Sequence, residues 1–166
     1  MKIRPASRSD LQKIAAIHIA SWRDTYADVL PPEFLERRIE PSLEKHWREI
    51  VIQKRDIVLV AEKGSIVGFI AVWCRPVPFI DNLHVTASLR SQKVGTALML
   101  AAADELIQQG HRAAYLWVFE SNRDAIRFYE RLGGVQKETA MKSIFGHDIS
   151  SRKIEWVDLR AIKKNQ

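Results

Sequence analysis

The sequence predicts an α/β fold in which helices flank a mixed β-sheet. Helical periodicity dominates the N-terminal third, short β-branched runs follow, and strand and helix patterns then alternate towards the C-terminus. Elements that interleave in this way pack in layers, with helices against a sheet. The chain has 166 residues, of which 46% are hydrophobic, so we expect one core and a single domain over residues 1–166.

The chain opens with a short extended segment and a helix. Residues 3–5 have no helical pattern and are expected to be extended. Ser9, with Gln12 three residues later, predicts a capping box. Apolar side chains then recur at helical spacing, which predicts a helix over residues 10–22.

Two further helices are expected before the first long strand. The Pro-Pro pair at residues 31–32 suits the first turn of a helix that ends near Arg38. A third helical stretch follows Pro41, with Ser42 as its expected N-cap.

The rest of the chain predicts strands first and then strands and helices in alternation. Residues 57–61 and 66–73 are apolar runs around a Lys-Gly-Ser turn, which is typical of a β-hairpin. The remaining predictions are strands over 77–85, 113–119, 135–144 and 152–159, helices over 93–109 and from Ser121, and a last turn at 146–148.

Composition argues against several functional classes. The chain has no apolar run of about 18 residues, so we expect no membrane association. It has one cysteine, Cys74, which favours the cytoplasm. The net charge of +6 is spread along the chain among acidic residues, so we expect no nucleic-acid partner.

The first candidate site is the loop between the strand over 77–85 and the next helix. A helix N-terminus presents free N–H groups and a partial positive charge, which suit a phosphate. A glycine there lets a ligand approach the backbone. Plain helix capping is the alternative at this point. The residues concerned are Arg90, Ser91, Gln92, Lys93, Val94, Gly95 and Thr96.

The second candidate site follows the strand over 113–119. Asn122 stands where this strand leads into a helix, and it either caps the helix or binds a polar ligand. Tyr129 lies further along the same helix. Its side chain is either part of the core or a general acid.

Three segments together resemble the GNAT superfamily of N-acetyltransferases. They are Leu83-His84-Val85, the run from Arg90 to Leu98, and Asn122-Arg123-Asp124-Ala125-Ile126-Arg127-Phe128-Tyr129 with Gly133-Gly134 beyond it. The segment from Ile14 to Leu30 is also similar to the opening helices of many bacterial members. The resemblance covers nearly the whole chain.

The resemblance implies a mostly antiparallel sheet of about seven strands, splayed between the fourth and fifth. It implies acetyl-CoA as cosubstrate, no metal, and a possible homodimer. Backbone groups of Leu83, His84 and Val85 would pair with the pantetheine arm, and the amides of residues 90–96 would hold the pyrophosphate. Asn122 and Phe128 would contact the cofactor, and Tyr129 would protonate the leaving thiolate.

This chain departs from the family pattern at two functional positions. Lys93 stands where the motif has its first glycine. Asn82 stands where many members have a glutamate, so Asp81 and His84 become the candidate general bases. Side chains alternate along a strand, so these two should face opposite sides unless a bulge intervenes.

The acceptor is expected to be a primary amine of a small molecule or a peptide. Trp22, Tyr26 and residues 145–148 are the candidates for lining its site, although Trp22 is also in phase with the core. His147 is expected to be exposed in a turn. A regulatory module that binds CoA without turnover is the alternative to an active enzyme.

Overall fold

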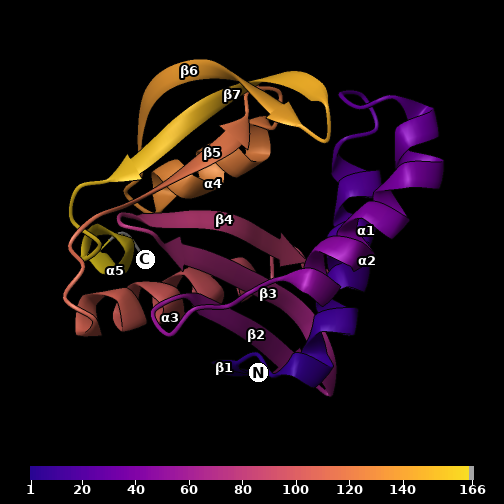
Figure 1. Cartoon of the computed structure of the whole chain (residues 1–166). Coiled ribbons are helices and arrows are strands. Elements are labelled where there is room, and N and C mark those ends of the chain that lie inside the picture. The colour runs from indigo at the N-terminus through magenta and orange to yellow at the C-terminus, as the bar shows by residue number, and fades with distance from the viewer. Residues whose placement is uncertain (165–166) are drawn as a thin grey trace.

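The computed structural model describes residues 1–164, which form a seven-stranded sheet with helices on both faces (Figure 1). The strand order is β1-β2-β3-β4-β5-β7-β6. Strands β4 and β5 are parallel, and the other neighbouring pairs are antiparallel. The predicted sheet is therefore confirmed. Its strands are β1 Lys2–Pro5, β2 Ile57–Lys63, β3 Ser65–Cys74, β4 Pro78–Val85, β5 Ala114–Phe119, β6 Val135–Ile144 and β7 His147–Trp156.

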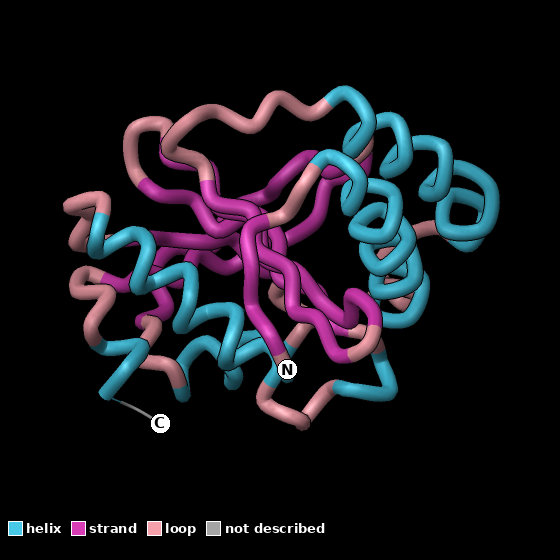
Figure 2. Tube along the Cα trace, turned by 90° about the horizontal axis from the view of Figure 1, so that it is seen from below, coloured by secondary structure: helices cyan, strands magenta, loops and turns pink. Residues whose placement is uncertain are grey.

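Helices pack on both sides of this sheet (Figure 2). Helices α3, α4 and α5 share one hydrophobic cluster with it. Helices α1 and α2 cover the opposite face through two further clusters. The helices are α1 Leu11–Thr25, the π-helix η2 Phe34–Arg38, α2 Ile39–Glu49, α3 Val94–Gln108, α4 Arg123–Arg131 and α5 Ala161–Lys164. Short 3-10 turns span Arg8–Asp10 and Ala87–Leu89.

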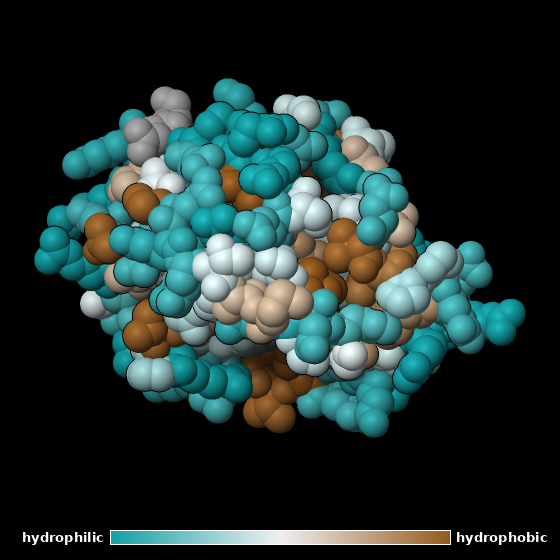
Figure 3. Space-filling model, turned by 90° about the horizontal axis from the view of Figure 1, so that it is seen from above, coloured by the Kyte–Doolittle hydropathy of each residue, from teal (hydrophilic) through white to brown (hydrophobic). Residues whose placement is uncertain are grey.

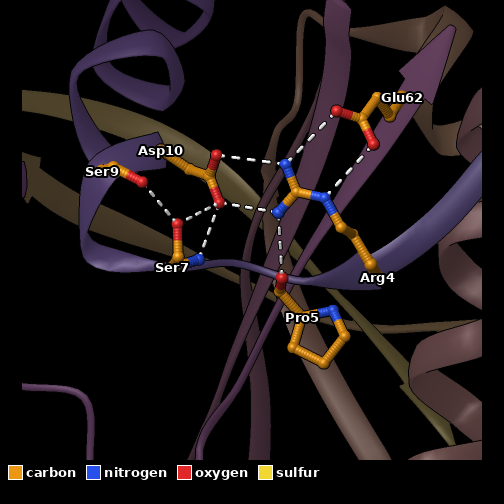
Figure 4. Close-up of polar contacts among 6 residues, drawn as sticks. All are labelled: Arg4, Pro5, Ser7, Ser9, Asp10 and Glu62. Carbon is orange, nitrogen blue, oxygen red and sulfur yellow. Dashed lines mark hydrogen bonds and ion pairs between the residues drawn. The ribbon is translucent and has the colours of Figure 1, made fainter.

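The entry into α1 is fixed by a buried carboxylate (Figure 4). The Ser7 N–H donates to Asp10 Oδ2 at 2.7 Å, and Arg4 Nη1 donates to the same oxygen at 2.7 Å. Arg4 Nε also donates to Glu62 Oε2 at 3.3 Å, which ties β1 to β2. The hydrogen bonds from Arg4 and from the Ser7 N–H hold the pKa of Asp10 well below its usual range. The capping box therefore begins at Ser7, and the prediction that it begins at Ser9 is wrong.

The second and third predicted helices form one continuous helical segment. Helix η2 runs directly into α2, and the Ile39 N–H donates to the Phe34 carbonyl. Pro41 lies inside α2, where it has no N–H to offer the preceding turn, and a π-turn accommodates such local misfits. Ser42 is therefore an interior residue of the helix and not its N-cap.

The last hairpin turns earlier than predicted. Its turn is Phe145-Gly146, with φ of 50° and 82°, and β7 already begins at His147. Positive φ at both turn residues matches the twist of the flanking strands. His147 and Asp148 thus belong to β7. The His147 ring is half-buried and lies 5.0 Å from the Phe34 ring, so the expectation that it is simply exposed is wrong.

Strands β4 and β5 diverge after a single paired position. Phe79 pairs with Tyr115, and their rings stack with centroids 5.2 Å apart. A register shift against β3 leaves Asp81 as an extra residue on β4. Such a bulge bends the strand and increases its twist. The predicted splay between the fourth and fifth strands is confirmed (Figure 1).

Helix α3 begins in a left-handed backbone conformation. Lys93, its N-cap, has φ 61° and ψ 13°, and Ser91 has φ 69°. A side chain in this region costs about 1–2 kcal/mol, which glycine avoids. Lys93 therefore keeps a backbone path that glycine would adopt freely, at a conformational cost.

Replacing Asp10 with Asn should lower the free energy of unfolding by about 2 kcal/mol at pH 7, because hydrogen bonds to charged groups contribute about 1.5–3 kcal/mol. The folded-state pKa of Asp10 lies below its unfolded-state value, so the unfolded chain binds the proton first. The contribution of the carboxylate is complete above about pH 5 and shrinks as the pH falls below about 4. Urea unfolding at pH 7 and pH 3 measures this, and an equal deficit of the variant at both values would contradict it.

Lys93→Gly should be more stable than Lys93→Ala by about 1 kcal/mol, because both variants lose the side chain and only alanine is strained at positive φ. Chemical denaturation measures the difference. Lys13, on the exposed face of α1, is the matched control. There the order should reverse, since glycine costs about 1 kcal/mol inside a helix. Alanine being the better residue at both positions would refute the strain at Lys93.

Candidate functional site

A cleft of about 1120 Å³ opens where β4 and β5 part. It extends from the start of α3 to helix α1 and the tip of the β6–β7 hairpin. This volume is adequate for a ligand the size of a cofactor. Its lining includes Trp22, Tyr26, Asp81, Leu83, His84, Val85, Arg90, Ser91, Lys93, Val94, Gly95, Thr96, Asn122, Phe128 and Tyr129. The structure thus brings together nearly all the residues singled out from the sequence.

The start of α3 offers free backbone N–H groups to this cleft. Among the described residues, no acceptor is bonded to the amides of Ser91, Lys93, Val94, Gly95 or Thr96. The first amides of a helix have no partner within it and carry a partial positive charge. This turn can therefore hold an anion such as a phosphate.

Two residues of the predicted anion-binding segment are engaged elsewhere. The Arg90 N–H donates to the Ala87 carbonyl at 3.2 Å, and the Gln92 N–H donates to the Leu89 carbonyl at 3.3 Å. The Arg90 guanidinium forms an ion pair with Asp24 of α1. Gln92 does not line the cleft. The free amides are thus those of residues 91 and 93–96, and not of the whole stretch 90–96.

Asn122 connects β5 to α4 and borders the cleft. Its Oδ1 accepts a hydrogen bond from the Ala125 N–H at 3.2 Å, which confirms the capping role. Phe128, further along α4, packs against the start of α3, because a Cβ built on Gly95 would lie 3.4 Å from its Cζ. These contacts bring the N-termini of α3 and α4 to the same end of the splay.

Tyr129 is part of the core and borders the cleft. Its side chain is 9% exposed, and its ring packs edge-on against Trp156 with centroids 6.0 Å apart. Burial raises the pKa of the phenol far above its ordinary value, and the neighbouring Tyr26 adds to this. Burial also raises the pKa of Tyr26, against opposing contributions from Asn122 and Arg90. Tyr129 therefore keeps its proton at neutral pH.

His84 packs between β4 and α1 in contact with two residues that sequence reasoning missed, His18 and Ser21. Its Nδ1 lies 2.9 Å from Ser21 Oγ, and its ring centroid lies 4.4 Å from that of His18. Burial and the positive charge of Arg90 lower the pKa of His84 to about 3. His84 therefore stays neutral in the physiological range.

The buried His18 has a defined tautomer. Trp47 Nε1–H donates to His18 Nδ1 at 3.0 Å, so the ring hydrogen is on Nε2. That Nε2 atom has no partner within residues 1–164. Burial lowers the pKa of His18 well below its usual value. The sequence signal was a histidine within the apolar stripe of α1, a pattern that fits a core histidine equally well.

The β-bulge changes how Asp81 is presented. Its Oδ2 accepts hydrogen bonds from Trp73 Nε1 at 2.8 Å and from Asn82 Nδ2 at 2.9 Å. Trp73 packs with the cluster under α1, whereas Leu83 packs with the cluster under α3. The bulge that the prediction allowed for is therefore present, and it interrupts the alternation that would put Asp81 and His84 on opposite faces.

Aromatic side chains line the end of the cleft next to α1. Trp22 is buried and also borders the cleft, so its packing in the core does not exclude it from the lining. Its ring lies 5.2 Å from Tyr26, 6.1 Å from Phe119 and 5.7 Å from Phe145, each edge-to-face. Sequence reasoning gave Phe119 no role in the site, because an apolar residue at the end of a buried strand is typical of the core.

The described part of the chain contains no cluster of three His, Cys, Asp or Glu residues that could hold a metal ion. None of its helices has the length and hydropathy needed to cross a lipid bilayer. The cleft itself offers free amides, a protonated phenol, neutral imidazoles and one carboxylate at the bulge.

Comparison with known proteins agrees with this geometry. The profile of the acetyltransferase (GNAT) family matches residues 14–134. The uncharacterized N-acetyltransferase YuaI of Bacillus subtilis is 28% identical over 167 residues, which cover 97% of this chain and 95% of that protein. The spermidine N(1)-acetyltransferase of Thermoplasma acidophilum is 26% identical over 151 residues, covering 84% and 91%.

A solved structure has the same fold. The PaiA N-acetyltransferase of Thermoplasma acidophilum, determined in complex with coenzyme A, superimposes with a TM-score of 0.72 at 21% identity. The superposition covers 91% of this chain and 96% of that one. Since the family profile matches most of the chain, including both motif segments and the strands that splay, the protein belongs to the GNAT family of acetyltransferases.

Proposed function

We propose that this protein transfers the acetyl group of acetyl-CoA to a primary amine. The observation that carries the proposal is the set of amides at residues 91 and 93–96, which have no acceptor among the described residues and belong to residues that line the cleft. A pyrophosphate at this turn would be bound by several N–H groups and by the helix dipole. The PaiA structure, in complex with coenzyme A, has the same fold.

The edge of β4 that faces the cleft would hold the pantetheine arm. Leu83 and Val85 pair on one side with Ile70 and Gly68 of β3. On the other side, the ladder with β5 is limited to Phe79 and leaves the later part of β4 open. Amide groups of the arm can pair with that open edge as an added strand would.

The reaction would then proceed by direct attack. The amine nitrogen forms a bond to the thioester carbonyl carbon, and the tetrahedral intermediate collapses with cleavage of the C–S bond. An ammonium group first loses one proton to become the neutral amine that attacks. The nitrogen loses another proton as the amide forms, and the leaving thiolate takes one. Tyr129 would supply the proton that the thiolate takes. Its position at the cleft and its protonated state at neutral pH support this role.

Asp81 is the better candidate for taking the amine proton, directly or through water. A full charge on His84 is strongly disfavoured, since burial and Arg90 lower its pKa to about 3. His84 would serve as a neutral hydrogen-bonding group beside the acceptor. Asp81 presents a carboxylate to the cleft, oriented by Trp73 and Asn82.

Gly95→Ala should weaken CoA binding about 10-fold while the protein remains folded. The added Cβ would meet Phe128 at 3.4 Å and Val85 at 3.9 Å, which is ordinary contact within the protein. It would stand among the amides of the cradle, where close backbone approach matters. Calorimetric titration with CoA measures the affinity. Gly64→Ala is a poor control because of its positive φ, so Ala97→Ser, one turn into α3, serves instead. Unchanged affinity in Gly95→Ala would remove the cradle from the proposal.

Tyr129→Phe should lower kcat at least ~100-fold with the Kd of CoA nearly unchanged, because general acids contribute about 10²–10⁴-fold. Thiol release with a panel of amines and N-terminal peptides measures kcat. Tyr115→Phe is the matched control, since Tyr115 lies on β5 outside the cleft lining. Its activity should equal that of the wild type.

The pH dependence separates the two candidate bases. With a pKa of about 3, His84 does not titrate between pH 5 and pH 8, so kcat/KM should show no inflection near 6.5 that His84→Gln abolishes. Such an inflection would make His84 the base.

Tight CoA binding by wild type without thiol release from any acceptor would instead indicate a regulatory CoA-binding module.

A further inference from the structure

We propose that the acceptor is a singly charged primary amine carried on an aromatic body, and that Phe145 selects it. This inference rests on the proposed function and names the substrate class of the same cleft. It is carried by an aromatic surface, an exposed ring on an unfavourable backbone, and the scarcity of carboxylates around them.

The aromatic surface lies at the acceptor end of the cleft. Trp22 meets Tyr26 and Phe145 edge-to-face, at 5.2 Å and 5.7 Å between centroids, and Tyr26 lies 4.4 Å from Phe119. All four rings line the cleft. Rings arranged in this way leave further faces and edges that suit another aromatic ring. On the side of α1 and α2, the view from above shows hydrophobic side chains gathered among hydrophilic ones (Figure 3).

Phe145 is held over the cleft at a conformational cost. It occupies the turn between β6 and β7 with φ 50°, a region that bulky side chains rarely adopt. Its side chain is 44% exposed and borders the cleft. Its ring contacts Trp22 and Phe34, each at 5.7 Å between centroids, and the rest of its surface stays open. An apolar ring on an unfavourable backbone, half open to a cleft, is what contact with an apolar ligand would favour.

The same region offers little to a polycation. Among the described residues that line the cleft, the carboxylates are Asp81 and Asp124. Asp124 is 92% exposed and pairs with Arg127 in the first turn of α4, on the cofactor side. Asp81 already accepts two hydrogen bonds and stands at the bulge. One ammonium group can be matched there, but a polyamine would bring further charges without partners.

The titratable side chains beside the aromatic surface support the same conclusion. His18 and His84 are neutral, as their lowered pKa values require. A relative of this chain is named a spermidine N(1)-acetyltransferase, so acceptor choice is a point on which the two proteins should differ.

The experiment compares 2-phenylethylamine, n-hexylamine and spermidine as acceptors at saturating acetyl-CoA. Thiol release gives kcat and KM, and calorimetry measures amine binding to the CoA-loaded protein. We expect kcat/KM for 2-phenylethylamine to exceed that for spermidine at least ~30-fold, about the range that pocket contacts supply. Equal or better use of spermidine, or failure of 2-phenylethylamine to bind, would overturn the inference.

Variants at the hairpin tip test the selecting residue. Phe145→Ala should raise KM for 2-phenylethylamine about 5–10-fold, the scale of one aromatic contact, with little change for n-hexylamine. Phe145→Gly removes the ring and relaxes the positive φ, so it guards against misfolding of the alanine variant. Met141→Ala is the matched control, because Met141 is an exposed apolar residue of the same hairpin that does not line the cleft. Equal losses for both amines would assign Phe145 a structural role.

Different results would overturn the acceptor class and the proposed function. If spermidine or a peptide is acetylated and the aromatic amine is not, the acceptor class is wrong and the transferase stands. If CoA does not bind and no amine releases thiol, the proposed function itself is wrong.

Discussion

The paired position of Phe79 and Tyr115 sets the geometry of the site. It is the one ladder position between β4 and β5 in the described chain, and the two rings stack across it. The neighbouring strands on either side are held in long antiparallel ladders. Beyond that position the bulge at Asp81 turns β4 away. The sheet is thus held closed at one end and open at the other, and the cleft follows from this difference.

Everything that faces the cleft is positioned by this opening. Helices α3 and α4 follow the two diverging strands, so both helix N-termini lie at the open end. The amides of α3, the Asn122 side chain and the Tyr129 phenol therefore line one space from segments far apart in the sequence. Helix α1 covers the other side with His18, Ser21 and Trp22. The ion pair between Arg90 and Asp24 ties the two sides together.

The spacing of apolar residues was enough to predict the type and order of the main elements. A helix or strand that buries one face repeats apolar residues with its own period. Boundaries failed where a tertiary contact decided them. Arg4 holds Asp10 in a capping box that begins at Ser7 and not at Ser9. The π-turn of η2 joined two helices that Pro41 was expected to separate. The Phe145-Gly146 turn let β7 begin five residues early.

The candidate site was predictable where a residue acts through its backbone or through a motif at fixed spacing. It was less so where the role depends on packing. The sequence could not show that the amides of Arg90 and Gln92 are bonded while their neighbours are free, because hydrogen bonds within the loop decide this. His18 and Ser21 were missed because a polar residue in an apolar helical stripe has no distinctive period. Side-chain alternation left the face of Asp81 dependent on whether β4 has a bulge, and no local sequence pattern decides that.

The most direct measurement is amide hydrogen exchange of the ¹⁵N-labelled protein, recorded by NMR with and without saturating CoA. Binding of the pyrophosphate at α3 predicts shifted resonances and strongly slowed exchange at residues 91 and 93–96, with smaller changes at residues 90 and 92, whose amides are already bonded. If CoA binds and these amides are unaffected, or if protection appears only elsewhere in the chain, the splayed cleft is not where the cosubstrate lies.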